Sequence, residues 1–252
     1  MKNFQGMMTI VSKRELVKDV FEMVLEGEAA RFIQAPGQFI NIKINDSLQP
    51  YLRRPMSICD YDENHITIIF KVVGEGTQIL SQKNIGDTLD CLIGLGNGFL
   101  DFQAQKAVVI GGGLGVPPMY NLAKTLKNHG VEVQAVLGFN SQNDIFYQKE
   151  FMDICPTYIA TMDGSVGVKG TVIDALKENH IEFDKYYACG PEKMLDALVL
   201  TYPENGYLSF EARMGCGFGA CMGCSCKVKT KPYKRICVEG PVLMSSEVIV
   251  NG

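Results

Sequence analysis

Short hydrophobic runs separated by turn residues dominate the first hundred residues of the chain. Apolar or alternating runs at residues 21–25, 38–44, 65–73 and 88–93 are rich in Val, Ile and Phe. Asp-Glu-Asn at 62–64, Gly-Glu-Gly at 74–76 and Gly-Asp at 86–87 separate them. This spacing is typical of strands in a small antiparallel barrel or sandwich. We therefore predict an antiparallel β-barrel domain over residues 1–101.

From residue 102 onward, strand-like and helix-like patterns alternate. Strands are predicted at residues 107–110, 131–139, 157–161 and 185–188, and helices at 117–128, at 171–178 and from near 191. Alternation of this kind predicts βαβ units and a parallel sheet, so we expect an α/β domain over residues 102–206. Residues 207–252 are rich in Gly, Cys and Lys and follow neither pattern. They are predicted to form a small third module.

The overall composition is that of an ordinary globular protein. Hydrophobic residues make up 46% and charged residues 21% of 252, which argues against a disordered, collagen-like or coiled-coil chain. The net charge of -4 leaves no basic surplus for a nucleic acid backbone. There is no apolar run of the roughly 18 residues that a membrane span needs, and no secretory pattern at the start. We expect a cytoplasmic protein that binds neither nucleic acid nor membrane.

Five of the nine cysteines lie close together near the carboxyl terminus. Cys216, Cys221 and Cys224 follow the C-x4-C-x2-C spacing of plant-type [2Fe-2S] loops, and Cys237 follows twelve residues later. Glycines at 215, 217, 219 and 223 let the backbone wrap closely and aim N–H groups at sulfur. We predict these four thiols as cluster ligands. Structural zinc is the alternative, although zinc sites usually add a second C-x2-C pair or histidine. Unligated thiols or a disulfide are the third interpretation.

Cys226 competes with Cys237 for the place of fourth ligand. If the chain enters a strand after Cys224, the side chains of Cys224 and Cys226 point to the same face. All ligands would then come from one short loop, which would leave one side of the cluster without protein. Cys237 follows the lysine-rich segment 227–235 and could approach from the opposite side. We therefore predict Cys237.

Two segments have features of nucleotide-binding sites. Gly-Gly-Gly-Leu-Gly at 111–115 follows a predicted strand and opens a predicted helix, where a pyrophosphate-binding turn belongs. Val116 breaks the G-x-G-x-x-G pattern, and a tight turn alone would explain the glycines. Arg-Arg-Pro-Met-Ser at 53–57 could present two solvated arginines. Alternatively, an arginine fork binds pyrophosphate there while Ser57 faces a flavin ring.

The order of these motifs resembles a known family. Residues 54–57, 74–77, 111–115 and Cys-Gly-Pro at 189–191 with Met194 are similar to those of ferredoxin-NADP reductase-like flavoproteins. These proteins pair an FAD-binding β-barrel with a nicotinamide-binding α/β domain. With residues 211–224 and 237–241 added, essentially the whole chain resembles the electron-transfer subunits of dihydroorotate dehydrogenase B.

The resemblance implies specific roles for residues of this chain. Arg54 would bind the FAD pyrophosphate, Ser57 would lie near the flavin N5, and Cys189 would lie beside the nicotinamide, with Ser57 and Cys189 as catalytic residues. The alternative for Cys189 is a small buried residue that ends a strand. The residues implied for FAD are Arg54, Pro55, Met56, Ser57, Ile69, Phe70, Lys71, Gly76 and Thr77. Those implied for NAD are Gly111, Gly112, Gly113, Gly115, Cys189, Gly190 and Pro191.

The resemblance also implies a function. A nicotinamide exchanges two electrons as hydride and a [2Fe-2S] cluster one, so FAD is needed between them. In the family, a partner subunit with FMN oxidises dihydroorotate, and electrons pass through the cluster and FAD to NAD+ in pyrimidine biosynthesis. The implied assembly is a heterotetramer of two subunits of each kind, and this chain alone should not oxidise dihydroorotate.

Two other interpretations are open from the sequence. One is the small subunit of an NADH-dependent ferredoxin:NADP oxidoreductase or of a sulfide dehydrogenase, which tends to place an acid where Cys216 stands. The other is a zinc-stabilised binding module without redox function. Residues 138–144 contain no Arg or Lys that could bind a 2′-phosphate, so we expect NADH to be preferred over NADPH.

Overall fold

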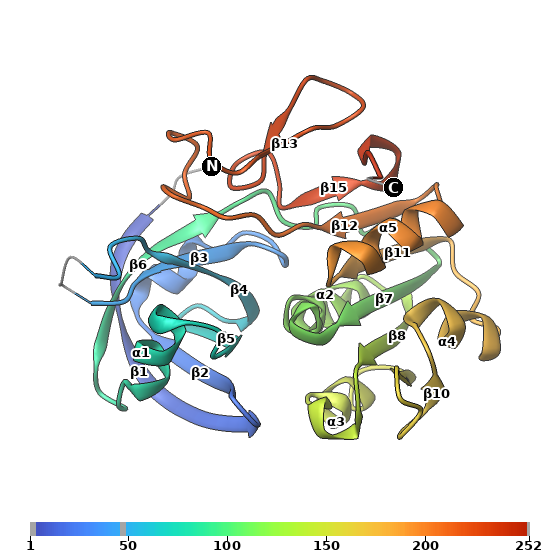
Figure 1. Cartoon of the computed structure of the whole chain (residues 1–252), viewed down its shortest axis with the longest axis horizontal. Helices are drawn as coiled ribbons and strands as arrows, with labels where there is room; N and C mark the ends of the chain where they lie inside the picture. Colours follow the sequence, from blue (N-terminus) through green and yellow to red (C-terminus); the bar gives the residue numbers. More distant parts are fainter. Residues whose placement is uncertain (1–3, 46–48, 251–252) are drawn as a thin grey trace.

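The computed structural model of the chain describes residues 4–45 and 49–250, and its amino-terminal part is a closed antiparallel barrel (Figure 1). The strands follow one another around the barrel in the order β1-β2-β5-β4-β3-β6. The predicted antiparallel barrel is confirmed. Its strands are β1 (Phe4–Val17), β2 (Val20–Glu26), β3 (Phe39–Lys43), β4 (Arg54–Tyr61), β5 (His65–Lys71) and β6 (Thr88–Leu95), with helices η1 (Glu28–Phe32) and α1 (Glu75–Gln82).

The barrel differs from the prediction at strands β1 and β4, which no predicted run covers, and at the turn predicted at 74–76. Strand β1 was missed, because of its fourteen residues only Met8 and Ile10 are fully buried and the hydrophobic alternation is correspondingly short. The predicted turn at 74–76 was wrong in part, because Gly74 is the N-cap of α1. The Thr77 hydroxyl accepts hydrogen bonds from the N–H groups of Val73 and Gly74, which satisfies donors near the helix start.

A mainly parallel sheet with helices on both faces forms the second domain (Figure 1). Its order is β10-β9-β8-β7-β11-β12-β15, so the predicted parallel α/β domain is confirmed. After β7 the chain adds β8, β9 and β10 on one side of β7, and then crosses over to add β11 on the other side of β7. The carboxyl ends of β7 and β11 are therefore a topological switch point, where ligands of such sheets bind. The elements are β7 (Lys106–Gly112), η2 (Gly113–Gly115), α2 (Val116–Asn128), β8 (Glu132–Phe139), η3 (Gln142–Asp144), α3 (Gln148–Met152), β9 (Thr157–Thr161), β10 (Val168–Lys169), α4 (Val172–Glu178), β11 (Lys185–Cys189) and α5 (Glu192–Thr201).

The carboxyl-terminal segment leaves this sheet and returns to it. Strand β12 (Gly206–Ser209) pairs in parallel with β11, and β15 (Val242–Met244) pairs antiparallel with β12. Between them, β13 (Ser225–Cys226) and β14 (Lys234–Arg235) form a small hairpin, and η4 (Ser245–Glu247) follows β15. We name residues 210–241 the cysteine loop. It lies above both domains in Figure 1.

A mixed hydrophobic and polar interface joins the barrel to the α/β domain. Buried residues of the barrel, including Cys59 and Ile69, belong to the same core as Met119 of α2. The buried Glu22 carboxylate is bound by the Arg14 guanidinium and by the Tyr147 hydroxyl, each at 2.7 Å. Arg14 neutralises the carboxylate within the barrel, and the Tyr147 hydroxyl links it to the α/β domain. Among the described helices, none is both long and apolar enough to cross a bilayer.

Candidate functional site

The glycine-rich turn after β7 is packed tightly against the end of β11. Gly111 and Cys189 are paired across the two strands. A Cβ on Gly115 would lie 2.1 Å from the Cys189 carbonyl oxygen, and one on Gly111 would lie 2.7 Å from the Cα of Val116. Both glycines are thus required by close packing of strand and helix. Gly113 differs from these two glycines. Its φ is +52°, and a Cβ added there would meet no atom within 4 Å, so space is open beside this residue of the turn.

A cavity of about 300 Å³ lies between the outer surface of the barrel and the cysteine loop. We name it the barrel cavity. Strands β4 and β5 supply one wall, and residues at the start of the cysteine loop supply the other. It gathers every residue expected to hold FAD except Gly76. The barrel contributes Phe39, Arg54, Pro55, Met56, Ser57, Ile69, Phe70, Lys71, Val73 and Thr77, and Leu114, Ser209, Phe210, Glu211, Ala212, Met214 and Pro241 complete the lining.

Adjacent arginines at the start of β4 have different environments. The Arg54 guanidinium lies over the first turn of α1, where a Cβ on Gly76 would come within 2.4 Å of its Nε. Arg53 instead donates to the Asp90 carboxylate and to its backbone carbonyl oxygen, both at 2.7 Å, which links β4 to β6. Arg54 donates to the Leu52 carbonyl oxygen and lines the barrel cavity, whereas Arg53 is paired with a carboxylate within the barrel.

The Thr77 hydroxyl is occupied by local contacts. It donates to the Gly74 carbonyl oxygen at 2.9 Å and accepts from two N–H groups that precede α1. Its part in binding a phosphate stays a prediction. In this structure the hydroxyl holds the turn that places Gly76 beneath Arg54.

The four cysteines predicted as ligands are held as two neighbouring pairs. The Sγ atoms of Cys224 and Cys237 are 3.2 Å apart, and both side chains are buried. Cys216 and Cys221 form the outer pair, in which the Cys221 N–H points to the Cys216 sulfur at 3.4 Å and the Cys216 N–H to the Cys221 sulfur at 3.5 Å. Cys226 lies on β13 and is half-buried.

Backbone N–H groups surround the thiols of the outer pair. The N–H of Ala220 reaches the Cys216 sulfur at 3.2 Å, and that of Gly223 reaches the Cys221 sulfur at 3.5 Å. Burial acts to raise the pKa of the Cys216 thiol, but N–H groups of Cys221, Phe218 and Ala220 outweigh it and lower the pKa to about 6. Stabilised thiolates of this kind are the form in which cysteine binds metal.

The segment that carries Cys237 is tied back to the rest of the cysteine loop. The N–H of Cys237 points to the Cys224 sulfur at 3.4 Å, and the N–H of Ile236 donates to the Cys224 carbonyl oxygen at 3.1 Å. Glu239 accepts from Lys231 at 2.7 Å and from the Arg235 Nε at 3.2 Å. These contacts hold the segment around Cys237 next to Cys224, on the buried side of the four cysteines.

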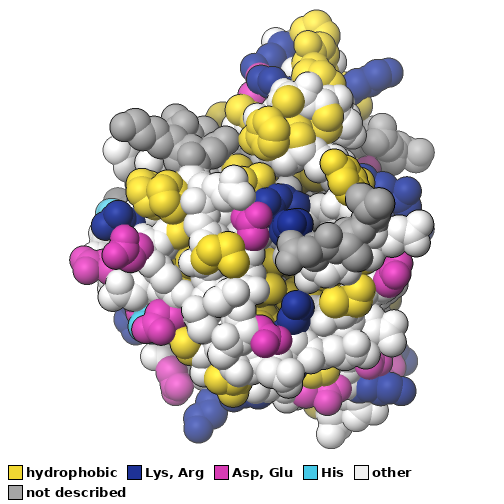
Figure 2. Space-filling model, turned by 90° about the vertical axis from the view of Figure 1, so that its left-hand side faces the viewer, with side chains coloured by type: hydrophobic (Ala, Val, Ile, Leu, Met, Phe, Trp, Pro, Cys, Tyr) yellow, Lys and Arg dark blue, Asp and Glu magenta, His cyan; other side chains and the backbone are white. Residues whose placement is uncertain are grey.

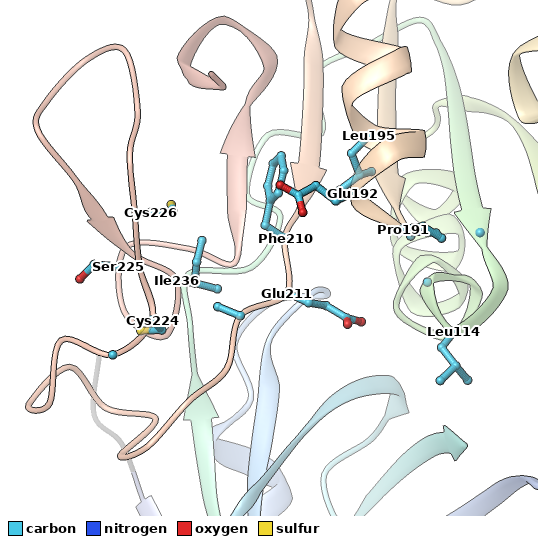
Figure 3. Close-up of a pocket in the computed structure, with 15 residues that line it drawn as sticks. Leu114, Pro191, Glu192, Leu195, Phe210, Glu211, Cys224, Ser225, Cys226 and Ile236 are labelled. Atoms are coloured by element: carbon cyan, nitrogen blue, oxygen red, sulfur yellow. The ribbon is translucent and has the colours of Figure 1, made fainter. Parts of the chain in front are cut away.

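A second cavity, of about 470 Å³, connects the switch point with the cysteines. We name it the cysteine cavity. Figure 3 shows Cys224, Ser225 and Cys226 on one side, Pro191 and Leu195 on the other, and Phe210 and Glu211 between them. Phe210 and Glu211 also line the barrel cavity, as do Leu114 and Ala212, so the two cavities share a wall.

Glu211 is a candidate functional residue to which the sequence reasoning assigned no role. Glu211 lines both cavities and is exposed at their shared wall. Partial desolvation there acts to raise the pKa of its carboxyl group. Its position two residues after β12, at the carboxyl end of a strand beside β11, is the signal that could have identified it.

Cys189 is fully buried at the end of β11, and burial raises the pKa of its thiol to about 12. Its side chain lines neither the barrel cavity nor the cysteine cavity. Gly190 and Pro191, which follow it, do line the cysteine cavity. The turn at Gly190 and Pro191 therefore lines the cysteine cavity, whereas the Cys189 thiol lies in the protein core.

A third cavity, of about 300 Å³, lies at the carboxyl ends of β7 and β8. We name it the sheet-edge cavity. Gly112, Gly113 and Pro191 line it together with Asn140, which follows β8, and Lys193 in the first turn of α5. All the residues expected to contact NAD therefore lie at or next to the switch point, on the ends of two adjacent strands.

Known proteins of similar sequence share the full length of the chain. It is 46% identical over 98% of its length to the dihydroorotate dehydrogenase B (NAD(+)) electron transfer subunit of a Geobacillus species, and covers 99% of that protein. The corresponding subunit of Fusobacterium nucleatum is 45% identical over 96% of this chain and 98% of its own. The chain belongs to the family of dihydroorotate dehydrogenase B electron transfer subunits.

Family models and solved structures agree with this membership. Residues 211–249 match the iron-sulfur cluster binding domain of dihydroorotate dehydrogenase B, and residues 109–199 match the oxidoreductase NAD-binding domain. A chain from the structure of NADH-dependent reduced ferredoxin-NADP oxidoreductase is 29% identical, with a TM-score of 0.88, and the match covers 97% of this chain and 90% of that one. The cytochrome P450 reductase GcoB of Amycolatopsis shares the fold at 17% identity and a TM-score of 0.68, over 80% of this chain and 66% of its own.

The thiol arrangement fits the two-iron cluster expected from the spacing. The four thiols lie as two neighbouring pairs with N–H groups pointing at the sulfurs. All four fall within residues 211–249, which match an iron-sulfur cluster binding domain. This match, together with the C-x4-C-x2-C spacing, favours an iron-sulfur cluster over structural zinc.

The placement of the thiols generates a prediction for Cys237 and Cys226. Cys237→Ser should remove the visible absorption and the reduced-state paramagnetic signal of the cluster, because Cys237 lies beside Cys224. Cys226→Ser is the matched control and should leave both signals nearly intact, because the sulfur beside that of Cys224 is the Cys237 sulfur, at 3.2 Å. Absorption and electron paramagnetic resonance spectra of the two purified variants check this. Loss of the cluster from Cys226→Ser alone would contradict the ligand assignment.

Proposed function

We propose that this chain carries electrons from a partner dihydroorotate dehydrogenase containing FMN, through a [2Fe-2S] cluster and FAD, to NAD+ in pyrimidine biosynthesis. The observation that carries the proposal is the wall shared by two cavities, formed by Leu114, Phe210, Glu211 and Ala212. This wall borders both the barrel cavity and the cavity that reaches the switch point and the thiols. FAD, the cluster and the nicotinamide could thus lie next to one another around residues 210–212.

We assign the barrel cavity to FAD. Arg54, held over Gly76 at the start of α1, would bind the pyrophosphate with its planar fork. Ser57 on β4 lines the same cavity and would donate a hydrogen bond to the flavin near N5, while Ile69 and Phe70 exclude water from one side. Bound FAD exchanges electrons with NAD in pairs and with the cluster one at a time. The protein contributes position and the electrostatic surroundings.

We assign the cluster to the two thiol pairs, with Cys216 and Cys221 on one iron and Cys224 and Cys237 on the other. The N–H groups directed at these sulfurs would stabilise the added negative charge of the reduced cluster. The buried inner pair faces protein on the side of the sheet, and the exposed Cys221 faces outward. The cluster would therefore lie between the interior of the molecule and its surface.

We assign the dinucleotide to the switch point and the sheet-edge cavity. The accessible backbone of Gly113 and the start of α2 would contact the phosphates. Glu211 would face the nicotinamide at the wall of the barrel cavity. When ionised, the Glu211 carboxylate would favour the cationic ring of NAD+ over neutral NADH, and the raised pKa of this group opposes that ionisation.

The surface near the exposed cysteine is suited to a protein partner. Phe218, Met222 and Tyr233 of the cysteine loop are 41–49% exposed. Figure 2 shows hydrophobic side chains together with Lys and Arg at the upper end of the molecule, where this loop lies. Exposed apolar side chains of this size mark interaction surfaces. We propose this surface as the contact with the partner subunit in a heterotetramer of two subunits of each kind.

Two further points belong to the proposal. The division into an FAD-binding domain over 1–101, an NAD-binding domain over 102–206 and a cluster module over 207–252 follows the functional assignments. We propose a cytoplasmic location, because the cluster thiols must be reduced to bind iron and cytoplasmic reductants keep them so.

Reconstitution tests the proposed function. The purified chain with FAD and cluster should be reduced by NADH, but should not oxidise dihydroorotate. Adding the FMN-containing subunit should produce NAD+ reduction that depends on dihydroorotate. Phe218→Glu should lower this coupled rate at least several-fold and leave NADH oxidation with a dye unchanged, whereas Ile85→Glu, on a 64% exposed barrel residue, should affect neither. Dihydroorotate oxidation by the chain alone would contradict the proposal.

Flavin retention tests the role of Arg54. Arg54→Ala should weaken FAD binding by about 1.5 to 3 kcal/mol, a roughly ten- to hundred-fold rise in Kd, through loss of a charge-assisted contact. Arg53→Ala is expected to retain more flavin, but Arg53 is bound to Asp90 and its removal would also weaken the barrel. Arg31→Ala is the cleaner control, because the Arg31 side chain is 59% exposed and does not line the barrel cavity. Equal FAD content in the Arg54→Ala and Arg31→Ala variants would refute the assignment.

Dinucleotide choice tests the sheet-edge cavity. NADH should be preferred over NADPH in kcat/KM for dye reduction, because residues 138–144 contain no Arg or Lys for a 2′-phosphate. Asn140→Arg should raise the efficiency with NADPH. Two lysines could supply the contact instead: Lys193, which lines this cavity, and Lys149, which follows residues 138–144 in the chain. Comparable use of both dinucleotides, abolished by Lys193→Ala, would show that this lysine supplies the phosphate contact and that the prediction fails.

A further inference from the structure

Asn41 is a buried polar residue in an otherwise apolar stretch of β3. Its neighbours Ile40 and Ile42 point into the barrel core, so the Asn41 side chain points to the outer surface of the barrel. It is nevertheless 0% exposed. The cysteine loop covers it, and this loop is about 175 residues away in sequence.

The Asn41 amide joins the barrel to the first predicted cluster ligand. Its Nδ2 donates to the backbone carbonyl oxygen of Cys216 at 3.3 Å. Gly217 packs against the same amide, since a Cβ there would lie 2.5 Å from Nδ2. The loop can therefore approach the amide this closely only because residue 217 is glycine.

The same residue is adjacent to the wall of the barrel cavity. Asn41 on β3 is the register partner of Pro55 on β4, and Pro55 lines the cavity assigned to FAD. The Arg53 guanidinium, anchored on Asp90, also donates to the Asn41 backbone oxygen at 3.4 Å. One paired strand position and one amide hydrogen bond thus connect Pro55, in the wall of the barrel cavity, with the Cys216 peptide of the cysteine loop.

The other half of the amide has no hydrogen-bond partner among the described residues. Asn41 Oδ1 is buried and accepts no hydrogen bond there. An unpaired buried acceptor costs free energy, and an apolar side chain of the same shape would avoid that cost. Stability alone therefore does not account for an amide at this position.

We propose that Asn41 is a positioning residue that docks the Cys216 peptide on the wall of the flavin cavity and sets the distance and electrostatic surroundings of the cluster. This inference rests on the proposed function. A loop held at one position keeps cluster and flavin close enough for electron transfer. The amide dipole next to a ligand also contributes to the field at the cluster, which is one of the determinants of its reduction potential.

Two nearly isosteric variants test this inference. Asn41→Leu removes the donor and the unpaired oxygen, and Asn41→Asp replaces the donor with a negative charge. Asn41→Asp should make the midpoint potential of the cluster more negative, because the added charge opposes uptake of an electron. Asn41→Leu should slow electron transfer from reduced flavin to the cluster several-fold without slowing flavin reduction by NADH. Redox titration followed by paramagnetic resonance, and rapid-mixing absorption, measure these effects.

Asn97 supplies the matched control. Its amide also joins the barrel to the cysteine loop, donating to the backbone oxygens of Glu239 and Val242 and accepting from the Val242 N–H. Asn97→Ala should lower the melting temperature of the apoprotein and leave the cluster potential unchanged. Unchanged potential, spectrum and electron-transfer rate in both Asn41 variants would overturn the inference. Absence of a cluster from the wild-type protein would instead refute the proposed function.

Discussion

The pairing of β12 with β15 is the contact on which the arrangement of the site depends. Ser209 and Val242 are register partners, and the Phe210 N–H donates to the Pro241 carbonyl oxygen at 2.9 Å. Both ends of the cysteine loop are thereby fixed side by side at the edge of the sheet. The loop contains the four predicted ligands and the shared wall of two cavities. Because its base is anchored in regular structure, fewer conformations of the loop are accessible and its side chains keep their positions.

Three close backbone approaches connect the parts of the site. Gly115 allows the helix after β7 to touch the end of β11, Gly76 allows Arg54 to lie on α1, and Gly217 allows the cysteine loop to reach Asn41. In each case a Cβ would overlap an atom from another element. The glycine at each position thus permits a contact between elements rather than only a local turn.

Much of the architecture was predictable because it follows from local patterns. The antiparallel barrel and the parallel sheet were confirmed, since the pattern of side-chain burial repeats over a few residues. Strand β1 was missed because only Met8 and Ile10 of its length are fully buried. The helix after Gly74 was missed because glycine opens turns and helices alike. The roles of individual site residues stay predictions, although most of those expected to hold FAD line one cavity.

The sequence by itself determined the succession of elements and the spacing of the thiols, because both depend on residues close together in the chain. Only the tertiary structure decided that Cys224 pairs with Cys237, that Glu211 faces two cavities, and that Asn41 reaches Cys216. Such contacts form where surfaces from distant segments pack together. They depend on the shape and burial of both partners, and no local pattern in either segment records the presence of the other.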